Sequence, residues 1–319
     1  MKATWRSISL ALFLSALPTR ACEEKSSGLE TLRAGARAAD QKDQRDFPVN
    51  YFSEASSHPS QFSPLRGTEW IHLNSSNFLD RAVLYLGSGP DVYRLVHDFP
   101  LAKEFHFLDL WTGWGASRQE VLDEAFRRLE QLASVTNASI AVESQGFLAG
   151  LSEETLRGKS DLSRAERNSH FVDEPILYRL DLRSADGAID ERRFYFHQIN
   201  FSDAGKMRVA LAKIQERRAI GACLTAGAPT PRWSARRVLR KSLDEGGVIV
   251  TETSDIDDSV KALKRLYARG GLKFRFGGRH HISGAGGGHN SDYYLKDLST
   301  SFFMNMQTLI FEKDRKSVV

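Results

Sequence analysis

The chain has 319 residues, of which 41% are hydrophobic and 26% are charged, and its formal net charge is +4. These values are ordinary for a soluble globular protein, and the length allows one large or two small domains. The slight charge comes from interspersed basic and acidic residues, so no nucleic-acid partner is indicated. The basic side chains of one stretch are interpreted as a solvated helix face: Arg232, Arg236, Arg237, Arg240 and Lys241.

The first segment predicts export. Lys2 and Arg6 flank the start, residues 8–17 are apolar, and small residues up to Ala21 offer a cleavage site. This layout is typical of a secretory signal peptide over residues 1–21, and it is too short to span a bilayer as a mature helix.

The cysteine that follows, Cys22, makes the segment resemble a bacterial lipoprotein signal, in which that cysteine becomes the lipidated first residue. Thr19 departs from the leucine that such signals usually carry three residues before the cysteine. The resemblance implies an exported protein, either periplasmic or anchored to a membrane through a lipid on Cys22. A misassigned start codon would instead make the protein cytoplasmic.

A polar stretch over residues 22–61 is interpreted as a flexible tether that contains one short helix, residues 29–39. Ordered structure is expected from residue 62, so the main α/β domain is predicted over residues 62–319. An insertion over about residues 140–192 is expected to be rich in β-structure, with a hairpin at residues 185–187.

The first strand of that domain runs into Gly87-Ser88-Gly89, where bare backbone can approach a ligand closely. The neighbouring apolar run ends at Asp109, whose carboxylate is placed to accept hydrogen bonds from a ribose diol. The pattern predicts a nucleoside-type ligand at this turn.

Helices and strands then alternate. A capping box formed by Ser117 and Glu120 opens one helix, and Asp203 is expected to cap another. The remaining strands are expected at residues 105–110, 194–199, 220–224, 248–251, 272–276 and 301–311. Strand–helix alternation followed by two successive strands predicts a mostly parallel seven-stranded sheet flanked by helices, with the last strand antiparallel.

This order resembles the class I S-adenosylmethionine-dependent methyltransferase fold, and the Leu84–Pro90 run resembles the glycine motif of that family. The resemblance covers about residues 80–312, in topology more than in sequence. It implies S-adenosylmethionine as cofactor, with Gly87 and Gly89 near its methionine part and Asp109 at the ribose. It also implies that Asn200 or Asp203 lies near the adenine.

The sequence departs from the pattern of this family in one loop that bears on catalysis. The loop after the fourth strand, Thr225–Pro231, has no side-chain acceptor in its Ala226-Gly227-Ala228 core, where amino-methylating relatives carry an Asn or Asp. No supporting spacing identifies a general base among the candidates His97, Asp98, His197 and Asp255. The catalytic residues are therefore left unassigned.

Two further groups of residues were considered for ligand binding. The Gly- and His-rich loop over residues 277–292 matches no standard metal-ligand spacing, so it is interpreted as a lid or hairpin loop and no metal site is predicted. Trp111, Trp114 and Trp233 follow strand ends and favour core packing over the wall of a pocket.

Two functional hypotheses follow. The first is a methyltransferase that uses S-adenosylmethionine on an unknown small molecule or protein. The second is a non-catalytic exported or lipid-anchored protein that uses the fold as a binding scaffold. Export favours the second, because S-adenosylmethionine is made in the cytosol.

Overall fold

The computed structural model describes residues 31–42, 66–111, 117–150, 174–183, 187–201, 203–225, 233–254, 257–269, 271–285 and 301–313. Its centre is a nine-stranded sheet in the order β3-β4-β5-β2-β1-β6-β7-β9-β8. The strands are β1 (Ala82–Leu86), β2 (Glu104–Asp109), β3 (Ser139–Ser144), β4 (Ile176–Arg183), β5 (Ile189–Gln198), β6 (Ile220–Thr225), β7 (Leu243–Ser254), β8 (Leu272–Ala285) and β9 (Ser301–Lys313).

The inner strands confirm the predicted fold class. Strands β5, β2, β1, β6 and β7 pair in parallel with one another in that order, and β9 lies antiparallel between β7 and β8. The last strand of the chain is thus inserted antiparallel next to the final parallel strand, as in the class I methyltransferase fold. Chain order reverses between β1 and β6, and ligands of open α/β sheets bind at the carboxyl ends of strands at such a point.

The predicted insertion adds two antiparallel strands to one edge of the sheet. β4 pairs with β5 from Ile176↔Phe196 to Arg183↔Ile189, and β3 pairs with β4 at the outer edge. The inward residues of β4 alternate with partly exposed ones, the pattern of an antiparallel strand with one covered face.

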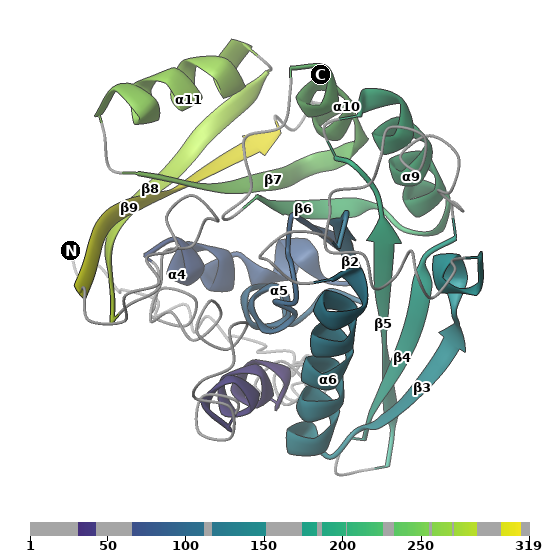
Figure 1. Ribbon diagram of the computed structural model, residues 1–319. Coiled ribbons are helices and arrows are strands. Elements are labelled where there is room, and N and C mark those ends of the chain that lie inside the picture. Colours follow the sequence, from purple (N-terminus) through teal and green to yellow (C-terminus); the bar gives the residue numbers. More distant parts are fainter. Residues whose placement is uncertain are drawn as a thin grey trace, which may run out of the picture.

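Helices cover both faces of the sheet (Figure 1). They are α4 (Arg66–Leu73), α5 (Tyr93–Asp98), α6 (Arg118–Thr136), α9 (Ala204–Arg217), α10 (Trp233–Ser242) and α11 (Asp257–Arg269), with short 3₁₀ segments η1 (Ser75–Phe78) and η2 (Gly146–Gly150). One buried apolar cluster joins the sheet to α4, α5 and α6, and a second joins it to α9, α10 and α11. Strands β1 and β6 are buried on both sides, which explains their continuous apolar sequences.

Two helix predictions in the N-terminal half can be compared directly with the structure. The capping box is present: the Ser117 side chain accepts from the Glu120 amide, and the Glu120 carboxylate accepts from the Ser117 amide. Residues 31–42, within the stretch interpreted as a tether, form a helix whose Leu32, Ala36 and Ala39 are buried in the first core cluster. The rest of that stretch and the predicted signal peptide lie outside the described residues.

Strands β7 and β8 are longer than expected. β7 begins at Leu243, before the expected start at residue 248, and runs through Gly246 and Gly247. Gly246 has a φ of 75°, and the register between β6 and β7 shifts there, so the glycines form an irregularity inside the strand. Residues 277–285 of the predicted glycine-rich loop belong to β8, because each pairs with a residue of β9.

Two smaller points concern membranes and thiols. None of the helices in the described ranges combines the length and apolarity that crossing a bilayer requires. Cys223 is buried in β6, and its burial raises the pKa of the thiol, which fits a small core residue.

Candidate functional site

The turn after β1 has the geometry that its glycines predict. Gly87 and Gly89 have φ values of 67° and 53°, a region that favours glycine because other residues carry a Cβ. The Gly87 amide donates to the carbonyl oxygen of Leu108 at 2.9 Å. The turn is therefore held against the carboxyl end of β2, where the sequence placed the ribose-binding acid.

That acid, Asp109, contacts the turn directly. Its Oδ2 accepts from the Gly89 amide at 2.8 Å, and its Oδ1 accepts from the Trp111 amide at 3.0 Å. Burial raises the pKa of Asp109, against the lowering effect of these backbone hydrogen bonds. A carboxylate offers about four acceptor positions, and the amides of Gly89, Trp111 and Leu110 engage part of this capacity.

The other predicted residues reach the same edge of the sheet from β5. The Ile199 amide donates to the carbonyl oxygen of Asp109 at 2.8 Å, which brings the residues after β5 beside the end of β2. Asp203 is the N-cap of α9, and its Oδ1 accepts from the Gly205 and Lys206 amides at 2.9 and 3.1 Å. Asn200 accepts from the Asp203 amide through its backbone carbonyl. Contact of Asn200 or Asp203 with an adenine stays a prediction.

The turn is more enclosed than its glycines alone suggest. Ser88, Gly89, Pro90 and Asp91 are buried, whereas Gly87 and Asp109 are partly exposed. The Ser88 hydroxyl donates to the carbonyl oxygen of Gly89 at 3.1 Å. A ligand would therefore approach through Gly87 and Asp109.

Trp111 links the ends of two strands in an unusual backbone conformation. Its φ is 57°, which is rare for a bulky residue and costs free energy. Its side chain is completely buried, packs against Phe196 and donates from Nε1 to the carbonyl oxygen of His197 at 3.0 Å. The prediction that Trp111 packs in the core is confirmed. Trp114 lies outside the described residues, as do Asp255 and the loop over residues 226–232.

A chain of buried polar groups on the other face of the same strands was missed by sequence reasoning. His106 Nδ1 and His197 Nε2 are 3.0 Å apart, and His106 Nε2 lies 3.2 Å from Glu104 Oε2. If His106 donates to Glu104, its Nδ1 accepts from the Nε2–H of His197. Tyr195 stacks on His106, and Arg217 lies over the Tyr195 ring. Only the parallel register of β2 and β5 brings these residues together.

Burial lowers the pKa of His197 well below its usual range, and the nearby His106, Arg217 and Lys213 lower it further. In the unfolded chain the same imidazole titrates near 6.5. Folding is therefore favoured by His197 above about pH 6.5, and this contribution is lost as the pH falls toward the lowered value.

The substitution His197→Gln should make folding stability less dependent on pH. Between about pH 6.5 and 5.5, the wild-type free energy of unfolding should fall more steeply than that of the variant, by up to about 1.4 kcal/mol per pH unit. Urea unfolding at several pH values measures both slopes. Equal slopes would show that His197 titrates in the folded protein as it does in the unfolded chain.

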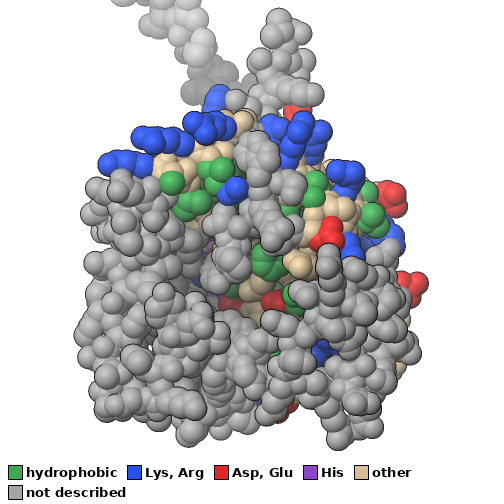
Figure 2. All heavy atoms as spheres, turned by 45° about the horizontal axis from the view of Figure 1, so that its top comes forward, with side chains coloured by type: hydrophobic (Ala, Val, Ile, Leu, Met, Phe, Trp, Pro, Cys, Tyr) green, Lys and Arg blue, Asp and Glu red, His purple; other side chains and the backbone are tan. Residues whose placement is uncertain are grey.

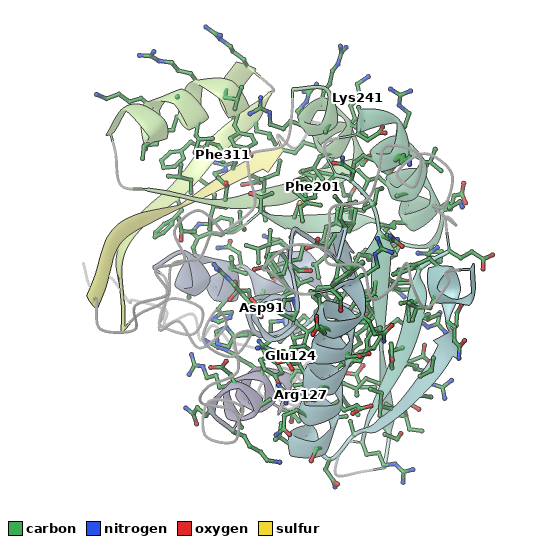
Figure 3. All side chains as sticks on the ribbon, viewed as in Figure 1. Asp91, Glu124, Arg127, Phe201, Lys241 and Phe311 are labelled. Carbon is green, nitrogen blue, oxygen red and sulfur yellow. The ribbon has the colours of Figure 1, made fainter. Side chains whose placement is uncertain are left out.

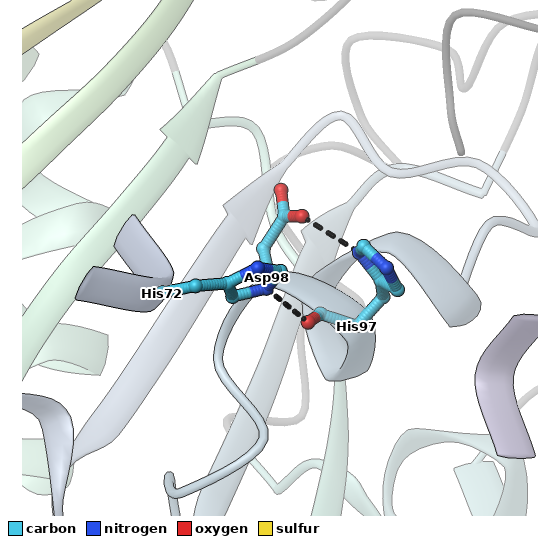
Figure 4. A group of neighbouring side chains, drawn as sticks. All are labelled: His72, His97 and Asp98. Atoms are coloured by element: carbon cyan, nitrogen blue, oxygen red, sulfur yellow. Dashed lines mark hydrogen bonds and ion pairs between the residues drawn. The ribbon is translucent and has the colours of Figure 1, made fainter. Parts of the chain in front are cut away.

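One further group has the composition of a metal site: His72, His97 and Asp98, whose ligand atoms lie within 4.8 Å of one another (Figure 4). His97 Nε2 accepts from Arg37 at 3.0 Å, and His97 Nδ1 lies 3.1 Å from Asp98 Oδ1. His72 Nε2 lies 3.0 Å from the carbonyl oxygen of His97. Both ring nitrogens of His97 are thus engaged, and the group joins α4, α5 and the helix at residues 31–42.

Among known proteins, the similarities found are to solved structures. No protein-family model and no curated protein sequence matches it. Precorrin-6y C5,15-methyltransferase of Geobacter metallireducens is 10% identical, with a TM-score of 0.38 over 77% of this chain and 88% of its own. Precorrin 8w decarboxylase of Methanobacterium thermoautotrophicum is 9% identical, with a TM-score of 0.39 over 78% and 89%. The N-methyltransferase NodS of Bradyrhizobium japonicum is 11% identical, with a TM-score of 0.35 over 80% and 97%. The strand order therefore carries the fold assignment.

Proposed function

We propose that this protein binds S-adenosylmethionine at the carboxyl ends of β1 and β2 and transfers its methyl group to a small molecule or protein. The observation that carries the proposal is the hydrogen bond between the Gly89 amide and Asp109 Oδ2. It joins a left-handed glycine turn to a carboxylate at the point where chain order in the sheet reverses. The site residues proposed are Gly87, Ser88 and Gly89 in the turn, with Asp109, Asn200 and Asp203.

The glycine turn and Asp109 would contact different parts of the cofactor. Gly87 and Gly89 carry no Cβ, so the turn leaves room for the methionine part of the cofactor. Asp109 would accept from the ribose through its remaining acceptor capacity, and hydrogen bonds to a charged acceptor are about twice as strong as neutral ones. No catalytic residue is assigned, because methyl transfer needs a placed acceptor and the loop after β6 lies outside the described residues.

Calorimetry with purified protein tests the proposal. S-adenosylmethionine and S-adenosylhomocysteine should bind with micromolar affinity, and Asp109→Asn should weaken binding by about 10- to 100-fold, the value of a lost charge-assisted contact. Asp123→Asn on the exposed side of α6 is the matched control and should bind as the wild type does. Absence of heat with both ligands would refute cofactor binding.

A second candidate function is favoured by the burial of residues 88–91. A turn that is already enclosed fits a non-catalytic protein that keeps the fold as a binding scaffold. That candidate predicts no binding of either nucleoside, with stability unaffected by their addition.

We further propose that the protein is exported and held at a membrane by a lipid on Cys22. The support is the order of charged, apolar and small residues before Cys22 in the sequence. Native mass spectrometry of the protein from its own source should give a mass that lacks residues 1–21 and carries an added lipid. An intact, unmodified N-terminus would overturn this proposal, and the same spectrum would reveal any retained nucleoside.

A further inference from the structure

A pocket of about 240 Å³ lies between α10 and α11, on the face of the sheet opposite α6. Its lining contains none of the residues proposed to bind S-adenosylmethionine, so the inference drawn from it stands apart from that function. The lining residues are Arg236, Arg237, Arg240, Leu266, Tyr267, Arg269 and Leu272.

The arginines of the pocket have no acidic partner among the described residues. Arg236 and Arg240 each have a buried Nε without a hydrogen-bond partner in the part of the chain that is described. Helix α10 contains four basic residues and no acidic one, and the two acidic residues of α11 stand at its opposite end from Arg269. Lys and Arg side chains gather along the edge formed by these helices (Figure 2). Arg236 and Arg240 are partly exposed and Arg269 is exposed, and an anionic ligand would supply the counter-charge that the described residues do not give them.

The Arg240 side chain reaches from α10 to the turn that follows α11. A Cβ added at Gly271 would lie 2.7 Å from Arg240 Nη1, so the guanidinium group extends from α10 to the turn between α11 and β8. Gly271 has a φ of 76°, and its amide donates to the carbonyl oxygen of Ala268 at 2.9 Å, which ends α11. This glycine turn therefore provides the space that the Arg240 side chain occupies. Lys241 points away from the fold at the top of α10 (Figure 3).

The remaining wall is apolar and carries no competing charge. Tyr267 and Leu272 are buried, and the Tyr267 ring packs at 4.4 Å from Phe311. Burial raises the pKa of Tyr267 to about 12, so its hydroxyl is neutral, and it is hydrogen-bonded to Thr251 rather than to a group in the pocket. An anion bound by the arginines would thus have an uncharged surface beside it.

We propose that this pocket binds a small organic phosphate, with its phosphoryl oxygens on Arg236, Arg240 and Arg269 and its carbon skeleton against Leu266, Tyr267 and Leu272. Guanidinium groups match phosphate oxygens in bidentate geometry, and a phosphoryl group offers acceptors to several of them at once. The volume is below the range of about 300–1,000 Å³ for drug-sized ligands, which favours a small molecule over a polymer. The sequence had indicated only a solvated basic face here; α11 and the Gly271 turn convert part of that face into a pocket.

Phenyl phosphate is the probe that tests the proposal, measured by calorimetry on the full chain. Phenyl phosphate should bind at least about tenfold more tightly than inorganic phosphate, because its ring adds buried apolar surface. It should also bind more tightly than benzoate, which has the ring but one negative charge and two oxygens. No binding of phenyl phosphate, or equal binding of phenyl and inorganic phosphate, would overturn the proposal.

Matched variants separate a defined site from general electrostatic attraction. Arg240→Gln and Arg236→Gln should each weaken phenyl phosphate binding about tenfold or more. Arg265→Gln removes the same charge from the exposed side of α11 outside the pocket and should leave binding unchanged. An equal loss in Arg265→Gln would contradict the proposal. Binding of S-adenosylmethionine should be the same in all three variants, whatever the outcome with phosphate.

Discussion

Replacing Trp111 with alanine should lower the free energy of unfolding by about 3–5 kcal/mol, the cost of removing a fully buried large aromatic side chain. Three losses add up in this variant. The ring leaves a cavity beside Phe196, the carbonyl oxygen of His197 loses its donor, and the strained backbone at a φ of 57° keeps its cost without the packing that offsets it. Urea unfolding followed by circular dichroism measures the change.

Two companion variants identify which loss dominates. Trp111→Gly removes the same side chain, but glycine adopts the left-handed backbone conformation without strain. This variant should therefore be less destabilising than Trp111→Ala by roughly 1 kcal/mol, whereas glycine is usually more destabilising than alanine in helices and strands. Trp111→Phe keeps most of the packing and loses the hydrogen bond to His197. If the glycine variant were the least stable of the three, the left-handed conformation of this residue would be contradicted.

The second large effect concerns a buried ion pair on α6. Arg128 is completely buried, and its Nε donates to Glu124 Oε1 at 2.7 Å. Glu124→Ala should destabilise the fold by about 3–5 kcal/mol, because it removes the carboxylate in direct contact with a buried guanidinium and leaves only the electrostatic attraction of Asp91. The more exposed Arg127 also contacts this carboxylate at 2.8 Å, and Glu124 and Arg127 lie on adjoining parts of α6 (Figure 3).

Arg127→Met is therefore the matched control, with an expected loss of about 0–1 kcal/mol for a partly exposed pair. The double variant Glu124→Leu with Arg128→Met should recover most of the stability that Glu124→Ala loses, because apolar side chains of similar volume can replace a buried ion pair. A double variant as unstable as Glu124→Ala would show that the core needs something other than charge balance at these positions.

Local chemistry made much of the central sheet predictable. The apolar runs that became β1 and β6 are continuous because both faces of a parallel strand are covered. The turn at Gly87 and the cap at Ser117 depend on residues close together in the sequence, so their geometry could be inferred without the partner strands.

What the sequence did not reveal depends on pairing between distant segments. The glycine- and histidine-containing half of β8 is a strand because β9 pairs with it, which overrides a composition typical of a loop. Likewise, β7 continues across Gly246 and Gly247 because β6 pairs with Leu243 before them and with Val248 after them.

The roles of several polar groups were also not predictable, because they depend on burial or on contacts between distant segments. Glu124 and Arg128 have the spacing of an ordinary surface pair, and only the burial of α6 changes their energetic role. His106 and His197 are far apart in the sequence and meet through the register of β2 and β5. The arginines of α10 needed α11 beside them before a pocket could be recognised. Asp109, by contrast, could be predicted because the end of a strand after a glycine turn has a defined place in this fold.

Hydrogen–deuterium exchange with S-adenosylhomocysteine tests the location of the cofactor most directly. Binding at the turn after β1 should slow exchange in two peptides, one covering residues 87–93 and one covering residues 108–111, because the Gly89 and Trp111 amides share the Asp109 carboxylate. Peptides from α10 and α11 should exchange as in the free protein. Unchanged exchange at both sites, or slowing confined to another part of the sheet, would contradict a cofactor site formed by Gly87, Gly89 and Asp109.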